Sequence, residues 1–122
     1  MKKIFVVDDN TANLLVAEEI LSEQYDVFTL SSATAMFDLL NTIIPDLILL
    51  DLLMPQINGV DALKRLKDDS RYADIPVMIM SARDVATVET LDFEMGVVYF
   101  IKKPFSKQVL LDLIKTRLSS SC

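Results

Sequence analysis

The 122-residue sequence contains no histidine, one cysteine and only two glycines. Without histidine, the chain can form neither a Ser-His catalytic triad nor a zinc site built from imidazoles. The single cysteine, Cys122, stands at the last position, so no disulfide can form within the chain, which suits a reducing, cytoplasmic setting. Gly59 and Gly96 are too few for a P-loop or a Rossmann glycine-rich turn. Any chemistry must therefore be built from carboxylates, hydroxyls and lysines, with or without a hard metal ion.

Charge and hydropathy narrow the classes of protein further. No apolar run is long enough to cross a membrane, and Lys2 and Lys3 precede only a short apolar run, which argues against a signal peptide. A net charge of -6 argues against direct binding to nucleic acid. With 52% hydrophobic residues the chain can bury the core of one domain. We expect that domain over 1–118, with 119–122 as a disordered tail or truncated linker.

Short apolar runs alternate with longer amphipathic stretches, which indicates strands and helices in turn. Strands are expected over 4–7, 25–30, 47–50, 77–80 and 97–101. Helices are expected from a cap at Asn10 or Thr11 to about residue 23, over 33–42, 58–67 and 84–95, and after a cap at Ser106. The run 47–50 is apolar at every position, as a central parallel strand should be. Five strand-helix repeats predict a doubly wound α/β fold with a parallel sheet covered by helices on both faces.

Polar residues follow the predicted strands at the edge where doubly wound sheets place their sites. They are Asp8 and Asp9 after the first strand, Asp51 after the third, Ser81 after the fourth, and Lys102 with Lys103 after the fifth. Each alone has an ordinary interpretation: an acidic pair before a helix is most often a cap, and a lysine at a strand end is usually solvated. Three carboxylates on one rim, however, repel one another unless a cation compensates them. Mg²⁺ prefers such oxygen ligands, so the pattern indicates a magnesium site.

Four motifs resemble those of the receiver domains of two-component response regulators, the CheY-like family. They are VVDDN at 6–10, DLLMPQING at 51–59, PVMIMSA at 76–82 and FIKKPF at 100–105. The resemblance covers nearly the whole chain. It implies a flavodoxin-like (βα)5 fold with a five-stranded parallel sheet in the order 2-1-3-4-5.

The resemblance also implies a set of roles around Asp51, the residue expected to accept the phosphoryl group. Asp9 is implied as a direct Mg²⁺ ligand and Asp8 as a ligand through water, with the backbone carbonyl of Leu53 completing the protein ligands. The donor would be a phosphohistidine on a sensor histidine kinase or a histidine phosphotransfer protein, because this chain has no histidine of its own.

The same resemblance implies a switch. Ser81 and Lys103 would bind the phosphoryl oxygens, and Ser81 would move together with the aromatic Phe100, which also has an ordinary interpretation as core packing. The output surface would be the fourth helix, fifth strand and fifth helix, where an output domain or effector protein binds and where a homodimer could form. Val98 and Tyr99 depart from the family, which often has acidic residues there, and make this face more apolar.

Two other functions compete with the phosphoacceptor switch. A degenerate receiver would bind partners without phosphorylation, but every acidic, hydroxyl and lysine position of the motifs is intact. A Mg²⁺-dependent phosphohydrolase of the haloacid dehalogenase type needs a second Asp two residues after its nucleophile, where this chain has Leu53. We therefore expect a switch that promotes its own phosphorylation and dephosphorylation and not a turnover enzyme.

Overall fold

The computed structural model describes residues 1–51, 59–81, 99–102 and 107–120. The strands are β1 (Lys3–Val7), β2 (Asp26–Leu30), β3 (Leu47–Asp51), β4 (Val77–Ser81) and β5 (Tyr99–Lys102). The helices are α1 (Thr11–Leu21), α2 (Ala33–Leu40), α3 (Gly59–Asp68) and α5 (Lys107–Ser120). The helix predicted over 84–95 and the cap predicted at Ser106 lie outside the described residues. None of the helices in the described ranges is both long enough and apolar enough to cross a membrane.

The five strands form one sheet in the order β2-β1-β3-β4-β5, and every neighbouring pair is parallel. This confirms the predicted fold class and strand order. All five residues of β3 are buried, as expected of a central strand with helices on both faces, whereas β2 at the edge is only partly buried. The order reverses between β1 and β3, so the space beyond their carboxyl ends is the place where such sheets bind ligands.

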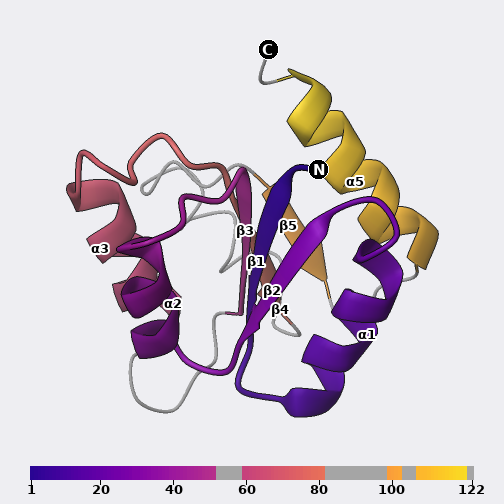
Figure 1. Ribbon diagram of the computed structural model, residues 1–122, viewed down its shortest axis with the longest axis horizontal. Coiled ribbons are helices and arrows are strands. Elements are labelled where there is room, and N and C mark those ends of the chain that lie inside the picture. The colour runs from indigo at the N-terminus through magenta and orange to yellow at the C-terminus, as the bar shows by residue number, and fades with distance from the viewer. Residues whose placement is uncertain (52–58, 82–98, 103–106, 121–122) are drawn as a thin grey trace.

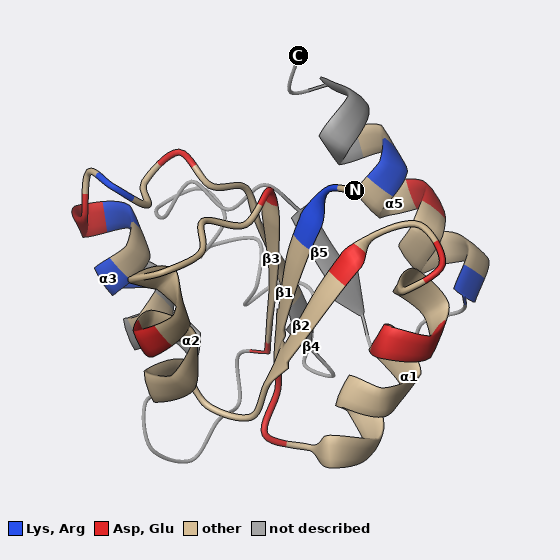
Figure 2. Cartoon of the chain, viewed as in Figure 1, with Lys and Arg blue, Asp and Glu red and all other residues tan. Residues whose placement is uncertain are grey.

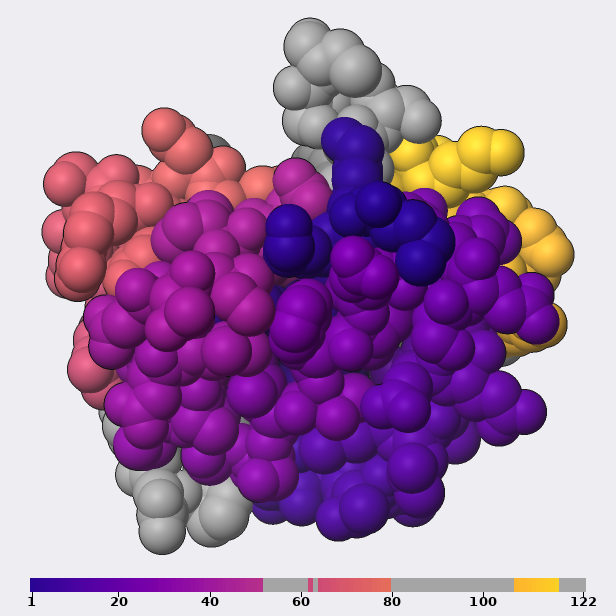
Figure 3. Space-filling model, viewed as in Figure 1, coloured from indigo at the N-terminus to yellow at the C-terminus, as the bar shows by residue number. Residues whose placement is uncertain are grey.

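Helices cover the two faces of the sheet in pairs, α1 with α5 on one side and α2 with α3 on the other (Figure 1). Alternate residues of the central strands supply two cores. Phe5 and Ile48 pack with Met36 and Leu66 under α2 and α3. On the opposite face, a second core combines strand and helix residues: Ile4, Leu49, Leu14, Ile20, Leu110 and Ile114. The space-filling view shows segments from the first half of the chain over the middle of one face of the molecule (Figure 3).

The first helix begins at a side-chain cap. Asn10 has extended backbone angles, and its side-chain oxygen accepts the backbone N–H groups of Ala12 and Asn13 at 2.9 and 3.3 Å. These are donors that a helix leaves without partners in its first turn. Of the two predicted caps, Asn10 is therefore correct. The helix ends at Leu21, two residues before its predicted end, and the N–H groups of Gln24 and Tyr25 both bond the Leu21 carbonyl in the turn that leads to β2.

The connection from α3 to β4 is held by side chains. The Lys67 amine donates to the carbonyl oxygens of Ala73 and Ile75, both at 3.1 Å. The Tyr72 hydroxyl donates to the Leu40 carbonyl at 3.4 Å, which ties the same connection to the end of α2. These bonds fix where β4 begins, and β4 lies directly beside β3 in the sheet.

At the other end of the chain, α5 runs to Ser120 and so continues two residues into the segment predicted as a tail.

Candidate metal centre

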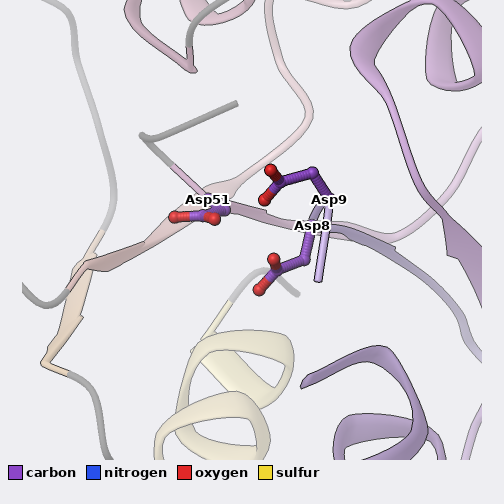
Figure 4. Close-up of side chains that lie close together, drawn as sticks. All are labelled: Asp8, Asp9 and Asp51. Atoms are coloured by element: carbon purple, nitrogen blue, oxygen red, sulfur yellow. The ribbon is translucent and has the colours of Figure 1, made fainter. Parts of the chain in front are cut away.

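Three aspartates meet at the carboxyl ends of β1 and β3. Asp51 is the last residue of β3, and Asp8 and Asp9 directly follow β1. Acidic residues mark the lower ends of both strands in Figure 2. Each aspartate offers one carboxylate oxygen, and these three atoms lie within 4.8 Å of one another. Figure 4 shows the side chains of Asp8 and Asp9 extending from the end of β1 toward the side on which Asp51 lies. The predicted convergence of these three residues is thus present.

The three carboxylates differ in their access to water. Asp8 is fully buried and Asp51 is 6% exposed, whereas Asp9 is exposed. Among the residues whose burial the structure describes, Asp8 and Asp51 are the buried charged side chains. Burying ionised carboxylates is costly unless they are paired, hydrogen-bonded or bound to a metal. The site is therefore a buried acidic pair with one acidic side chain at its solvent-facing edge.

Asp8 is held by hydrogen bonds from several directions. Its own N–H donates to the Leu30 carbonyl in β2 at 3.0 Å. Its Oδ1 atom accepts the backbone N–H of Asn10 at 2.9 Å, and its Oδ2 atom accepts the side-chain amide of Asn13 at 3.2 Å. The carboxylate of Asp8 is thus fixed against both the sheet and the first turn of α1.

Of the remaining predicted site residues, Ser81 stands at the same end of the sheet and Phe100 lies further back along β5. Ser81 is the last residue of β4, in register with Lys102 of β5, and Phe100 is in register with Ile79. Leu53 and Lys103 lie outside the described residues.

Asn13 was not predicted as a site residue. The available signal was its position three residues after the Asn10 cap, from which a polar side chain can reach back toward the start of a helix.

The donor set fits a small, hard cation. All three side chains offer carboxylate oxygens, which are the ligands that Mg²⁺ prefers, and several of its ligands are commonly waters. Two oxygens on opposite sides of one Mg²⁺ lie about 4.2 Å apart, which is twice the metal–oxygen distance. Separations within 4.8 Å therefore leave room for direct ligands together with ligands that act through water.

Comparison with known proteins agrees with the predicted family and fold. The model of the response regulator receiver domain matches residues 4–115. The polar-differentiation response regulator DivK of Brucella abortus is 29% identical over 121 residues, which cover 98% of each chain. The response regulator PleD of Caulobacter vibrioides is 31% identical over 115 residues, which cover 93% of this chain and 25% of PleD. The chain spans about a quarter or less of several curated relatives that it matches.

A solved structure shows the same fold. It is the receiver domain of the sensor histidine kinase PA1611 from Pseudomonas aeruginosa PAO1, with a magnesium ion coordinated in its active site cleft. It aligns with a TM-score of 0.86 at 20% identity and covers 97% of this chain and 98% of its own.

Three observations therefore coincide: the strand order, the aspartates beyond β1 and β3, and a family match over nearly the whole chain. Receiver domains are the phosphoacceptor switches of two-component phosphorelays. The chain belongs to the response regulator receiver domain family.

Proposed function

We propose that this receiver domain takes its phosphoryl group on Asp51, from a phosphohistidine on a sensor histidine kinase or a histidine phosphotransfer protein. The position of Asp51 carries the proposal: it ends the central strand β3, and its carboxylate lies within 4.8 Å of those of Asp8 and Asp9. Asp8 is fully buried and hydrogen-bonded through both oxygens, so it is poorly placed to meet a donor on another protein.

The transfer exchanges one bond to phosphorus for another. A carboxylate oxygen of Asp51 attacks the phosphorus in line, and an O–P bond forms while the N–P bond of the phosphohistidine breaks. The histidine nitrogen leaves with the electron pair of that bond. Because the transition state is loose, positioning of the reactants and neutralisation of the phosphoryl charge carry most of the catalysis.

Because the site is acidic, phosphoryl transfer to Asp51 requires above all that the negative charge in the site is neutralised. A phosphoryl group approaching Asp51 meets the negative charges of Asp8 and Asp9 within the same small site. We assign Asp9 as a direct Mg²⁺ ligand, Asp8 as a ligand through water, and Asp51 with the Leu53 carbonyl as the remaining protein ligands. When bound, Mg²⁺ supplies the positive charge that offsets the phosphoryl oxygens. A receiver domain of the same fold holds magnesium in its cleft, which supports this assignment.

Ser81 and Lys103 are proposed to bind the phosphoryl oxygens once Asp51 is modified. The sheet register supports this role for Ser81, because Asp51 pairs with Met80 and Ser81 is the next residue along β4. Ser81 and Phe100 would then change the face formed by the predicted fourth helix, β5 and α5. That face is the proposed binding surface for an output domain or effector protein, and for a homodimer.

We propose that the receiver domain spans 1–118, at whose end α5 continues to Ser120. We also propose that it acts in the cytoplasm and binds neither nucleic acid nor membrane directly. The net charge of -6 and the lack of any possible internal disulfide support this setting.

Intact mass after incubation with acetyl phosphate and Mg²⁺ tests the proposal. The wild type should gain one phosphoryl group, and Asp51→Asn, which keeps the shape of the side chain, should gain none. An equal adduct on Asp51→Asn would overturn the assignment of Asp51. A wild type that gains no adduct would favour a receiver that binds partners without phosphorylation, and steady release of phosphate from small phosphoesters would favour a phosphohydrolase.

A further inference from the structure

The side chain of Asn13 donates a hydrogen bond to the carboxylate of Asp8. It is the third residue of α1, and its Nδ2 atom lies 3.2 Å from Oδ2 of Asp8. The backbone N–H of the cap residue Asn10 lies 2.9 Å from the other oxygen of the same carboxylate. Two donors from the first turn of α1 therefore hold the two oxygens of one buried acidic side chain.

The chemistry of this pair is specific. An ionised carboxylate only accepts hydrogen bonds, so the amide of Asn13 must present its NH₂ group to Asp8. Two bonds, one to each oxygen, set the plane of the carboxylate. A neutral amide does so without cancelling the charge, whereas a lysine or arginine would form an ion pair with Asp8 and compete with a cation for it.

The role of the side chain can be separated from helix capping. The backbone N–H of Asn13 is the group that Asn10 caps, at 3.3 Å, and it remains when the side chain is shortened to alanine. Alanine is also the best helix former. Loss of the Asn13 amide therefore removes a donor from Asp8 while the cap of α1 stays in place.

We propose that Asn13 is a positioning residue for the metal centre, which holds the carboxylate of Asp8 in the orientation that serves a bound Mg²⁺. The inference rests on the proposed function, in which Asp8 is a ligand through water. Asn13 is not itself a ligand. Partners that orient the ligands of a metal change its affinity by about 10–100-fold when they are removed.

The test is Mg²⁺ titration followed by NMR on the wild type, Asn13→Ala, Asp8→Ala and the double variant. Asn13→Ala should weaken Mg²⁺ binding about tenfold, the lower end of that range, because Asp8 acts through water. In the Asp8→Ala background the same substitution should change nothing, since Asn13 acts through Asp8. Asn41→Ala, which removes an exposed amide at the C-terminal end of α2, is the matched control and should bind as the wild type does.

A second readout needs no metal. The carboxyl carbon resonance of Asp8 should move in metal-free Asn13→Ala and stay in place in Asn41→Ala. Unchanged Asp8 resonance, or wild-type Mg²⁺ affinity in Asn13→Ala, would overturn the positioning role. The positioning role would also be overturned if Asn13→Ala lowered the Mg²⁺ affinity equally in the wild-type and the Asp8→Ala backgrounds. A wild type that binds no Mg²⁺ would instead overturn the proposed metal site, and this inference with it.

Discussion

Asp9 follows β1 and Asp51 ends β3, yet their carboxylates offer oxygens within 4.8 Å of each other. The two side chains differ in burial, because Asp51 is 6% exposed and Asp9 is exposed. In the metal-free protein the two negative charges repel, and the protein tolerates this at the edge of its core. The same arrangement is what a divalent cation requires, so stability and metal binding are opposed at Asp9.

Asp9→Ala should therefore raise the stability of the metal-free protein and lose most of the stabilisation by Mg²⁺. The gain should be on the order of 1 kcal/mol, the Coulomb energy of two unit charges about 4–5 Å apart in nearly aqueous surroundings. Thermal melting with and without Mg²⁺ measures both effects. Glu18→Ala, at an exposed position of α1, removes the same charge away from the cluster and controls for net charge. If Asp9→Ala kept the full Mg²⁺-induced rise in melting temperature, Asp9 would not be a ligand.

Lys67→Met should destabilise the fold by about 1–3 kcal/mol, because it removes two hydrogen bonds to the carbonyls of Ala73 and Ile75 and leaves those acceptors in a partly buried place. Methionine keeps the length of the aliphatic chain. Lys64→Met, on the same helix but exposed, is the matched control. Urea denaturation should separate the two variants. Equal unfolding midpoints would show that Lys67 does not hold the connection before β4.

The buried hydroxyl of Tyr25 should make the folded protein less stable in alkaline solution. Burial raises the pKa of its hydroxyl above the usual value, because the ionised form is disfavoured out of water. In the folded state the Tyr25 hydroxyl therefore keeps its proton at a pH where the same hydroxyl in the unfolded chain has lost it. The stabilisation is fully present below the unfolded pKa of about 10 and disappears as pH rises through the folded pKa. Tyr25→Phe should lose stability less steeply above pH 10 in denaturation measured against pH, and identical slopes would contradict this.

The sequence predicts the strands and the convergence of the aspartates for one physical reason. Fully apolar runs such as 47–50 must be buried on both faces, and the carboxyl ends of parallel strands meet at one edge. Strand ends are less predictable: β3 includes Asp51 because its backbone pairs with Met80, a property of the ladder and not of the side chain. The bonds from Asn13 to Asp8 and from Lys67 to Ile75 depend on side-chain conformations, which the spacing of residues along the sequence permits but does not specify.

Ser81, at the end of β4, is the proposed switch residue. Ser81→Ala should still be phosphorylated at Asp51, because the nucleophile and the proposed Mg²⁺ and Lys103 carry the chemistry without a hydroxyl. A hydrogen bond to a charged group contributes about 1.5–3 kcal/mol. Moving a two-state equilibrium from 1:99 to 99:1 takes about 5.5 kcal/mol, so Ser81 supplies a large part of the shift but not all of it. The variant should therefore give a partial conformational response.

NMR shifts in residues 84–95 and in β5 measure that response in the wild type and in Ser81→Ala, each bound to Mg²⁺ and beryllofluoride, which mimics the phosphoryl group. Ser70→Ala, in the exposed connection before β4, is the matched control and should respond as the wild type does. If Ser81→Ala showed smaller shifts while intact mass showed undiminished phosphorylation, Ser81 would act in the conformational response and not in the phosphorylation of Asp51. Ligand-induced shifts identical to those of the wild type would mean that Ser81 is an ordinary residue at a strand end, because the conformational equilibrium would then not depend on its hydroxyl.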